Sequence, residues 1–210
     1  MDFFLIHCLI LTWATLATAR RLCAHPLDQL LAAGLVASAN LVVTSLVLSA
    51  LHRLGEPAWF LGTSTALALL TGLVAQRCPP DTPEPEGTGP NPIWRNLFVL
   101  SIGAAAVANG IAAWFHEAYN AEALAQQLPR AMYYLGQGHL SPVTLPDPQR
   151  AGLPFNYDLL MLFGLVYGPP PTCLNFFNLL AWLAGGLAVY RLCRLSQLNA
   201  NASLGAAWFA

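Results

Sequence analysis

The residues whose types suit chemistry gather in one segment, residues 116–158, which separates two strongly apolar parts of the chain. Its ionisable side chains include four carboxylates, two arginines and a histidine: Glu117, Glu122, Asp147, Asp158, Arg130, Arg150 and His139. A carboxylate near a membrane surface can act as a general base or a metal ligand, and an arginine can hold a phosphate through two parallel hydrogen bonds. Plain solvation is the role that we prefer for Asp147 and Arg150. We expect the chemistry of the chain in this segment.

Other kinds of catalytic or metal site have no support in the sequence. It contains no glycine loop for nucleotides, no nucleophile elbow, no HExxH and no DxD pair. The five cysteines are scattered, without a CxxC pair or zinc-ligand spacing, and we interpret them as small buried hydrophobes or idle thiols. The histidines are dispersed as well. We expect His7, which lies in an apolar run, to be a hydrogen-bonded interior residue and not a ligand.

The composition indicates that a membrane positions this segment. Charged residues make up 9% of the chain and hydrophobic residues 56%, whereas soluble domains average about 25% and about 45–50%. All nine basic residues are arginines and the net charge is -1, so no basic patch exists to neutralise phosphates, and a nucleic-acid partner is excluded. The predicted fold class is all-α: a polytopic membrane helix bundle with an external loop that carries an amphipathic, membrane-surface helix.

Residues 1–76 are predicted to form an N-terminal membrane segment of three helices. The expected spans are residues 3–19, 30–51 and 58–76. Arginines follow the first span and none precedes it, which favours an uncleaved span with its N-terminus outside over a signal peptide. Asn40, inside the second span, is expected to form a hydrogen bond with a neighbouring helix.

The remainder is predicted as a cytoplasmic linker rich in proline and glycine, residues 77–96, and a membrane core, residues 97–210, that contains the external loop. Residues 157–168 are apolar but about half as long as a bilayer crossing requires, so we expect them to be re-entrant or tilted. The other spans expected in the core are residues 97–115, residues 173–190 and a further span that starts at residue 204.

The arginines predict an orientation. With the N-terminus outside, the Arg20/Arg21 turn and the linker from Arg77 to Arg95 lie in the cytoplasm, and residues 116–158 lie outside. After Asp158 two alternatives remain open. Two further crossings would place Arg191 and Arg194 outside. If residues 157–168 are re-entrant and do not cross, the two arginines lie in the cytoplasm instead.

The first half of the external loop has a helical pattern. Leu124, Leu128, Met132 and Leu135 recur on one face, and Glu122, Gln126, Arg130 and Tyr133 recur on another. We expect the apolar face to contact lipid or the bundle and the polar face to meet water. Pro129 removes a backbone donor, so the helix is predicted to kink there or to break with Leu128 at the joint.

Three passages resemble a known family. Leu128-Pro129-Arg130 with the AMYYLGQGHL that follows, PFNYDLLMLFGL, and LNFFNLLAWLAGGLAVYRLCRLSQL together resemble bacterial membrane glycosyltransferases. These form the polytopic superfamily that uses polyprenyl-phosphate sugars and is related to the protein mannosyltransferases. The resemblance covers about residues 94–210 and implies that the loop carboxylate, here Glu122, is catalytic. This sequence departs from the family's pattern at Ala121, where an aromatic residue is usual, and at Gln127, where a histidine is usual.

The resemblance implies an integral membrane glycosyltransferase of the bacterial inner membrane, or the N-terminal part of one. It would transfer a hexose or pentose from a lipid-phosphate-linked donor to an acceptor at the external face, with membrane lipids as its surroundings. Glu122 would be the base, with a divalent metal left open as a cofactor, and Arg130, Tyr133 and Asp158 would bind substrate. The alternative is a non-catalytic scaffold, a transporter-like subunit or a degenerate remnant. A transporter normally shows polar groups deep in its spans, which here are nearly bare.

Overall fold

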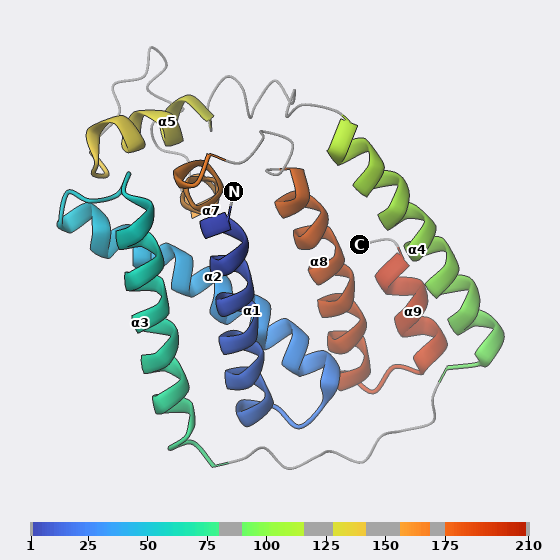
Figure 1. Ribbon diagram of the computed structural model, residues 1–210. Coiled ribbons are helices and arrows are strands. Elements are labelled where there is room, and N and C mark those ends of the chain that lie inside the picture. Colours follow the sequence, from blue (N-terminus) through green and yellow to red (C-terminus); the bar gives the residue numbers. More distant parts are fainter. Residues whose placement is uncertain (1, 80–89, 116–127, 142–155, 169–174, 209–210) are drawn as a thin grey trace.

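A computed structural model describes residues 2–79, 90–115, 128–141, 156–168 and 175–208, and in these ranges all regular secondary structure is helical, as predicted (Figure 1). The helices are α1 Asp2–Leu22, α2 Pro26–Ala50, α3 Pro57–Ala75, α4 Pro92–Phe115, α5 Leu128–Gln137, α7 Asn156–Val166, α8 Asn175–Leu195 and α9 Ala200–Trp208.

Four of these helices are long and apolar enough to cross a membrane: Phe3–Leu22, Pro26–Ala50, Pro57–Ala75 and Pro92–Ala112. Large side chains point outward from them, for example Leu35 with 73% of its surface exposed and Leu100 with 71%. So extended an apolar surface is stable in lipid and not in water. The chain is therefore a membrane protein.

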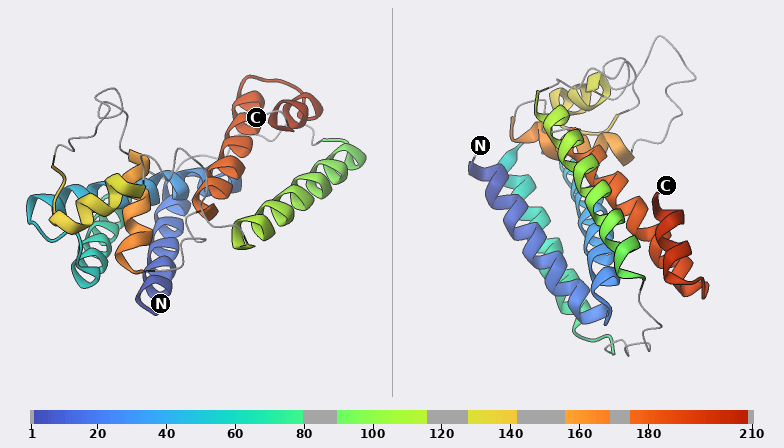
Figure 2. Two further views of the ribbon diagram at one scale, coloured as in Figure 1. Left: turned by 90° about the horizontal axis from the view of Figure 1, so that it is seen from above. Right: turned by 90° about the vertical axis from the view of Figure 1, so that its right-hand side faces the viewer.

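The helices form two neighbouring groups. α1, α2 and α3 pack on one another, with α5 and α7 at one end of this group, and α4, α8 and α9 form the second group (Figure 2). Prolines occupy the first positions of α2, α3 and α4, where a missing N–H costs no helix hydrogen bond. α4 starts at Pro92, inside the stretch that was expected to be linker up to residue 96.

α5 is bound to the turn between α2 and α3. The Leu54 N–H donates to the Gly138 carbonyl at 3.0 Å, and the Leu140 N–H donates to Ser49 Oγ at 2.8 Å. Two glycines permit this close approach. A Cβ on Gly138, whose φ is +70°, would lie 3.3 Å from the His52 carbonyl oxygen, and a Cβ on Gly55 would lie 3.1 Å from a backbone oxygen of α5. The end of α5 is thus fixed against the first group.

An ion pair between distant helices decides the topology after Asp158. Arg191, in the last part of α8, donates from Nε and a terminal nitrogen to both oxygens of Asp28, at 2.6 and 2.7 Å. Asp28 lies in the first turn of α2, so α8 ends where α1 ends and α2 begins. α7 has 11 residues, about 16 Å of rise against a hydrocarbon core of about 30 Å. Of the two alternatives, the one without a crossing by residues 157–168 therefore holds.

The arginines consequently gather at one end of the bundle. Six of them lie at helix ends on that side, and Arg53 and Arg130 lie at the other side together with α5 and α7 (Figure 1). The six are Arg20, Arg21, Arg77, Arg95, Arg191 and Arg194. Hereafter these two sides are called the arginine-rich end and the α5–α7 end.

Candidate functional site

The α5–α7 end contains a buried ion pair. Arg130, in the first turn of α5, donates from a terminal nitrogen to Asp158 Oδ2 at 3.0 Å, and the two side chains are 5% and 2% exposed. Asp158 lies in the first turn of α7, where the helix dipole favours a negative charge. Pro129 directly precedes Arg130 in α5. The pair joins two helices whose paired residues are 28 positions apart in the sequence.

Burial shifts the pKa values of Asp158 and of the nearby Tyr134. Burial raises the pKa of the Asp158 carboxyl above its ordinary value, and the Arg130 guanidinium acts in the opposite direction. Tyr134, one turn after Arg130, is 8% exposed, and burial also raises the pKa of its hydroxyl. The charge of Arg130 lowers the pKa of that hydroxyl and the charge of Asp158 raises it, so the three groups interact electrostatically.

The expected division of α5 into an apolar and a polar face needs a correction at Arg130. Leu128 and Leu135 do pack on the hydrophobic core, while Met132 is 54% exposed. Arg130, however, is placed in the interior and not on the polar face. The reason is its partner: a guanidinium tolerates burial when a carboxylate and hydrogen bonds satisfy it, and Asp158 on α7 provides the carboxylate.

The structure brings together two of the four residues expected to form the site. Arg130 and Asp158 are in contact, whereas Tyr133 lies on the outward side of α5, 39% exposed, with its ring centroid 6.2 Å from that of Tyr134. Glu122, the expected base, lies outside the described residues. Sequence reasoning missed Tyr134, although its position one helical turn after Arg130 was a usable signal.

The described residues contain no group of three or more histidine, cysteine, aspartate or glutamate side chains that could hold a metal ion. His139, which also lies at the α5–α7 end, contacts the His52 ring with 4.7 Å between ring centroids. Glu117, Asp147 and Arg150 fall outside the described residues.

A second polar cluster lies inside the first helix group and was not expected. His7 of α1 is fully buried; its Nδ1 lies 2.7 Å from the Tyr167 hydroxyl and its Nε2 lies 2.8 Å from Ser64 Oγ. Ser64 donates to Asn40 Oδ1 at 2.6 Å, and the Asn40 amide donates to the Ser64 carbonyl at 3.0 Å. Thr44 also donates to Asn40 Oδ1, at 3.4 Å. These side chains connect α1, α2 and α3 with the C-terminal end of α7.

The hydrogen-bond directions fix the form of His7. Because Ser64 gives its only hydroxyl proton to Asn40, its oxygen accepts from His7, and Nε2 carries the imidazole proton. Nδ1 is then the acceptor, and the proton of the Tyr167 hydroxyl is shared between Nδ1 at 2.7 Å and the Pro57 carbonyl at 3.3 Å. The predictions of a hydrogen-bonded His7 and of an interhelical bond from Asn40 are confirmed. The expectation of spans nearly bare of polar groups is corrected, because the first helix group holds this cluster in its interior.

No protein-family model, curated protein or solved structure matches this chain.

Proposed function

We propose that the chain is an integral membrane glycosyltransferase, or the N-terminal part of one, which transfers a hexose or pentose from a polyprenyl-phosphate donor to an acceptor. One observation carries the proposal. The Arg130–Asp158 pair joins the LPR passage to the PFNYD passage, two of the three stretches on which the family resemblance rests. Passages that contribute to one site must meet in the fold, and these two meet in a buried and specific contact.

The proposed chemistry needs a base for the acceptor hydroxyl and positive charge near the departing phosphate. Glu122 takes the proton of the acceptor hydroxyl, the acceptor oxygen attacks the anomeric carbon, and the bond to the lipid phosphate breaks, with its electrons leaving on the phosphate. Glu122 belongs to the segment that leads directly into α5.

The roles expected for Arg130 and Asp158 change with their burial. A guanidinium that is 5% exposed and paired with a carboxylate offers no open face to a donor phosphate. We therefore assign Arg130 and Asp158 a positioning role, in which they hold α5 against α7. Tyr133, with 39% of its surface exposed on the same helix, is the side chain open to the donor.

The arginine distribution supports the orientation of this site. Cytoplasmic loops carry an excess of arginine and lysine, and six of the nine arginines lie at the arginine-rich end. We propose that this end faces the cytoplasm of a bacterial inner membrane, so that α5 and α7 face outward. A lipid-linked donor and an acceptor would then meet at the external surface.

Matched variants of two carboxylates test the mechanism. The full chain is reconstituted in vesicles with polyprenyl-phosphate mannose or polyprenyl-phosphate arabinose, and release of polyprenyl phosphate is measured. Glu122→Gln keeps the size of the side chain and removes the basic charge, so release should stop, while Glu117→Gln should retain it. Unchanged release by Glu122→Gln, with reconstitution confirmed, would remove Glu122 from the mechanism.

A transporter-like subunit is the second candidate, and the buried cluster around His7 is the observation that favours it. Polar and ionisable side chains inside a membrane often mark an ion or proton path. In that case proton entry into vesicles loaded with a pH-sensitive dye should depend on the chain and should be lost in His7→Gln. Sugar transfer that survives in His7→Gln would favour the glycosyltransferase.

A further inference from the structure

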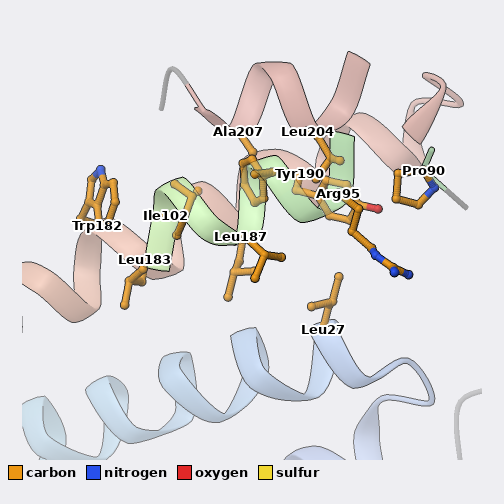
Figure 3. A pocket seen from close by; sticks show the side chains of 13 residues that line it. Leu27, Pro90, Arg95, Ile102, Trp182, Leu183, Leu187, Tyr190, Leu204 and Ala207 are labelled. Carbon is orange, nitrogen blue, oxygen red and sulfur yellow. The ribbon is translucent and has the colours of Figure 1, made fainter. Parts of the chain in front are cut away.

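A cavity of about 520 Å³ lies between α4, α8 and α9, away from the site at the α5–α7 end (Figure 3). This volume falls within the range of about 300–1,000 Å³ that is usual for ligand pockets. Its walls are almost entirely apolar and include Phe98, Ile102, Leu183, Leu187 and Leu204. A cavity with such walls does not hold water, because water needs two to four polar partners.

The charged group of the cavity, the Arg95 guanidinium, lies at one end. Arg95 and Pro90 lie at that end, whereas Trp182 and Leu183 lie at the opposite end (Figure 3). Tyr190 lines the wall near Arg95 and stands eight residues after Trp182 on α8, which corresponds to about 12 Å of rise. The cavity is therefore elongated, with a charged end and an apolar end.

The charge of Arg95 is available to a ligand. Among the described residues no carboxylate pairs with Arg95, and its Nε makes only a long hydrogen bond to Asn96 Oδ1, at 3.5 Å. Arg191, at the same end of the bundle, is by contrast held by Asp28. Arg95 also lies at the arginine-rich end, which is the depth at which lipid headgroups of that leaflet lie.

We propose that this cavity binds one acyl chain of an anionic phospholipid, with the headgroup phosphate on Arg95. The apolar walls accept hydrocarbon, and a guanidinium binds phosphate through charge-assisted, paired hydrogen bonds. The charged end of the cavity corresponds to the lipid headgroup, and the end at Trp182 and Leu183 corresponds to the acyl chain. The inference goes beyond the proposed glycosyl transfer, because the cavity lies between α4, α8 and α9 and none of its lining residues belongs to α5 or α7.

Brominated lipids provide the test, because bromine on an acyl chain quenches tryptophan fluorescence on contact and Trp182 lines the cavity. The full chain is reconstituted in phosphatidylcholine vesicles that contain rising fractions of brominated phosphatidylglycerol or brominated phosphatidylcholine. The signal of Trp182 is the difference between the wild type and Trp182→Phe. It should be quenched at a lower fraction of the anionic lipid than of the neutral one.

Two pairs of variants localise the effect. Arg95→Gln should reduce the preference for phosphatidylglycerol about five-fold, as expected for one arginine near a lipid headgroup. Arg77→Gln, an exposed arginine at the same end but outside the cavity, should leave the preference unchanged. Ile102→Phe should reduce quenching by both lipids by filling the cavity, whereas Val107→Phe, on the same helix but outside it, should not.

Three results would overturn the inference. The first is equal quenching of Trp182 by the two brominated lipids, a result that needs only the wild type and Trp182→Phe. The second is an equal loss of preference in Arg77→Gln and Arg95→Gln. The third is a Trp182 that neither lipid quenches in the vesicles, which would mean that a protein segment or a second copy of the chain fills the cavity.

Discussion

Removal of one partner of the Arg130–Asp158 pair should destabilise the fold strongly and unequally. Breaking a buried ion pair costs about 3–5 kcal/mol when one charge is left behind. In Asp158→Asn the guanidinium loses the charge that lies 3.0 Å from it, and arginine cannot discharge by losing its proton. In Arg130→Gln the remaining carboxyl can take up a proton instead. We therefore expect the full cost of about 3–5 kcal/mol for Asp158→Asn and a smaller one for Arg130→Gln.

The same reasoning gives a pH dependence with a definite sign. The folded-state pKa of Asp158 is raised above its unfolded value, so this carboxyl contributes stability that is present below the unfolded pKa and is lost as pH rises through the folded pKa. Removing Arg130 removes the interaction that lowers this pKa. The free energy of unfolding of Arg130→Gln should therefore increase as pH falls from neutral, by more than that of the wild type. Asp158→Asn, which has no carboxyl at this position, should not show this increase in the free energy of unfolding.

A double-mutant cycle completes the test. The cycle compares the wild type, Arg130→Met, Asp158→Leu and the double variant that carries both substitutions. The double variant leaves no charge of this pair buried, so it should lose less free energy of unfolding than either of these two single variants. Reversible unfolding in mixed micelles, at several pH values, gives the four free energies. Single variants that cost less than about 1 kcal/mol, or a double variant whose cost equals the sum of the singles, would show that the pair does not hold α5 to α7.

Three further predictions concern orientation, the buried cluster and the α5 turn. In single-cysteine chains in intact cells, an impermeant thiol reagent should label Gln137→Cys on α5 and not the exposed native Cys78, and the opposite pattern would reverse the proposed orientation. His7→Ala should lower the free energy of unfolding in micelles by about 1–2 kcal/mol, since interhelical hydrogen bonds contribute at most about 1.7 kcal/mol each, and an unchanged value would mean that the cluster is not stabilising. Gly138→Ala should cost about 1–2 kcal/mol because φ is +70°, whereas the control Gly136→Ala, with open space at its Cβ, should be neutral or stabilising in the same unfolding assay.

Local properties of the sequence were enough to predict much of the fold. Long apolar runs bounded by polar residues identify the four candidate spans, because length and hydropathy alone decide whether a helix can cross a bilayer. Asn40 could be assigned an interhelical bond because a polar amide in lipid requires a partner.

Features that depend on distant partners could not be predicted. The burial of Arg130 depends on Asp158, and the path of α8 is fixed by a pair between Asp28 and Arg191, which are 163 residues apart. The cluster around His7 needs four helices in register, and none of its members is distinctive in its own segment. Helical periodicity assigns a face to a residue but does not state what the neighbouring helix places opposite that face.

Donor turnover by the wild-type chain tests the proposed activity most directly. The full chain is reconstituted in vesicles that contain polyprenyl-phosphate mannose or polyprenyl-phosphate arabinose in the leaflet on the α5–α7 side, and release of polyprenyl phosphate is followed over time against vesicles without protein. We predict release that depends on the chain and on an added acceptor hydroxyl, and that is absent when the donor is confined to the leaflet at the arginine-rich end. Release no faster than in protein-free vesicles, with either donor in either leaflet, would contradict the glycosyltransferase proposal.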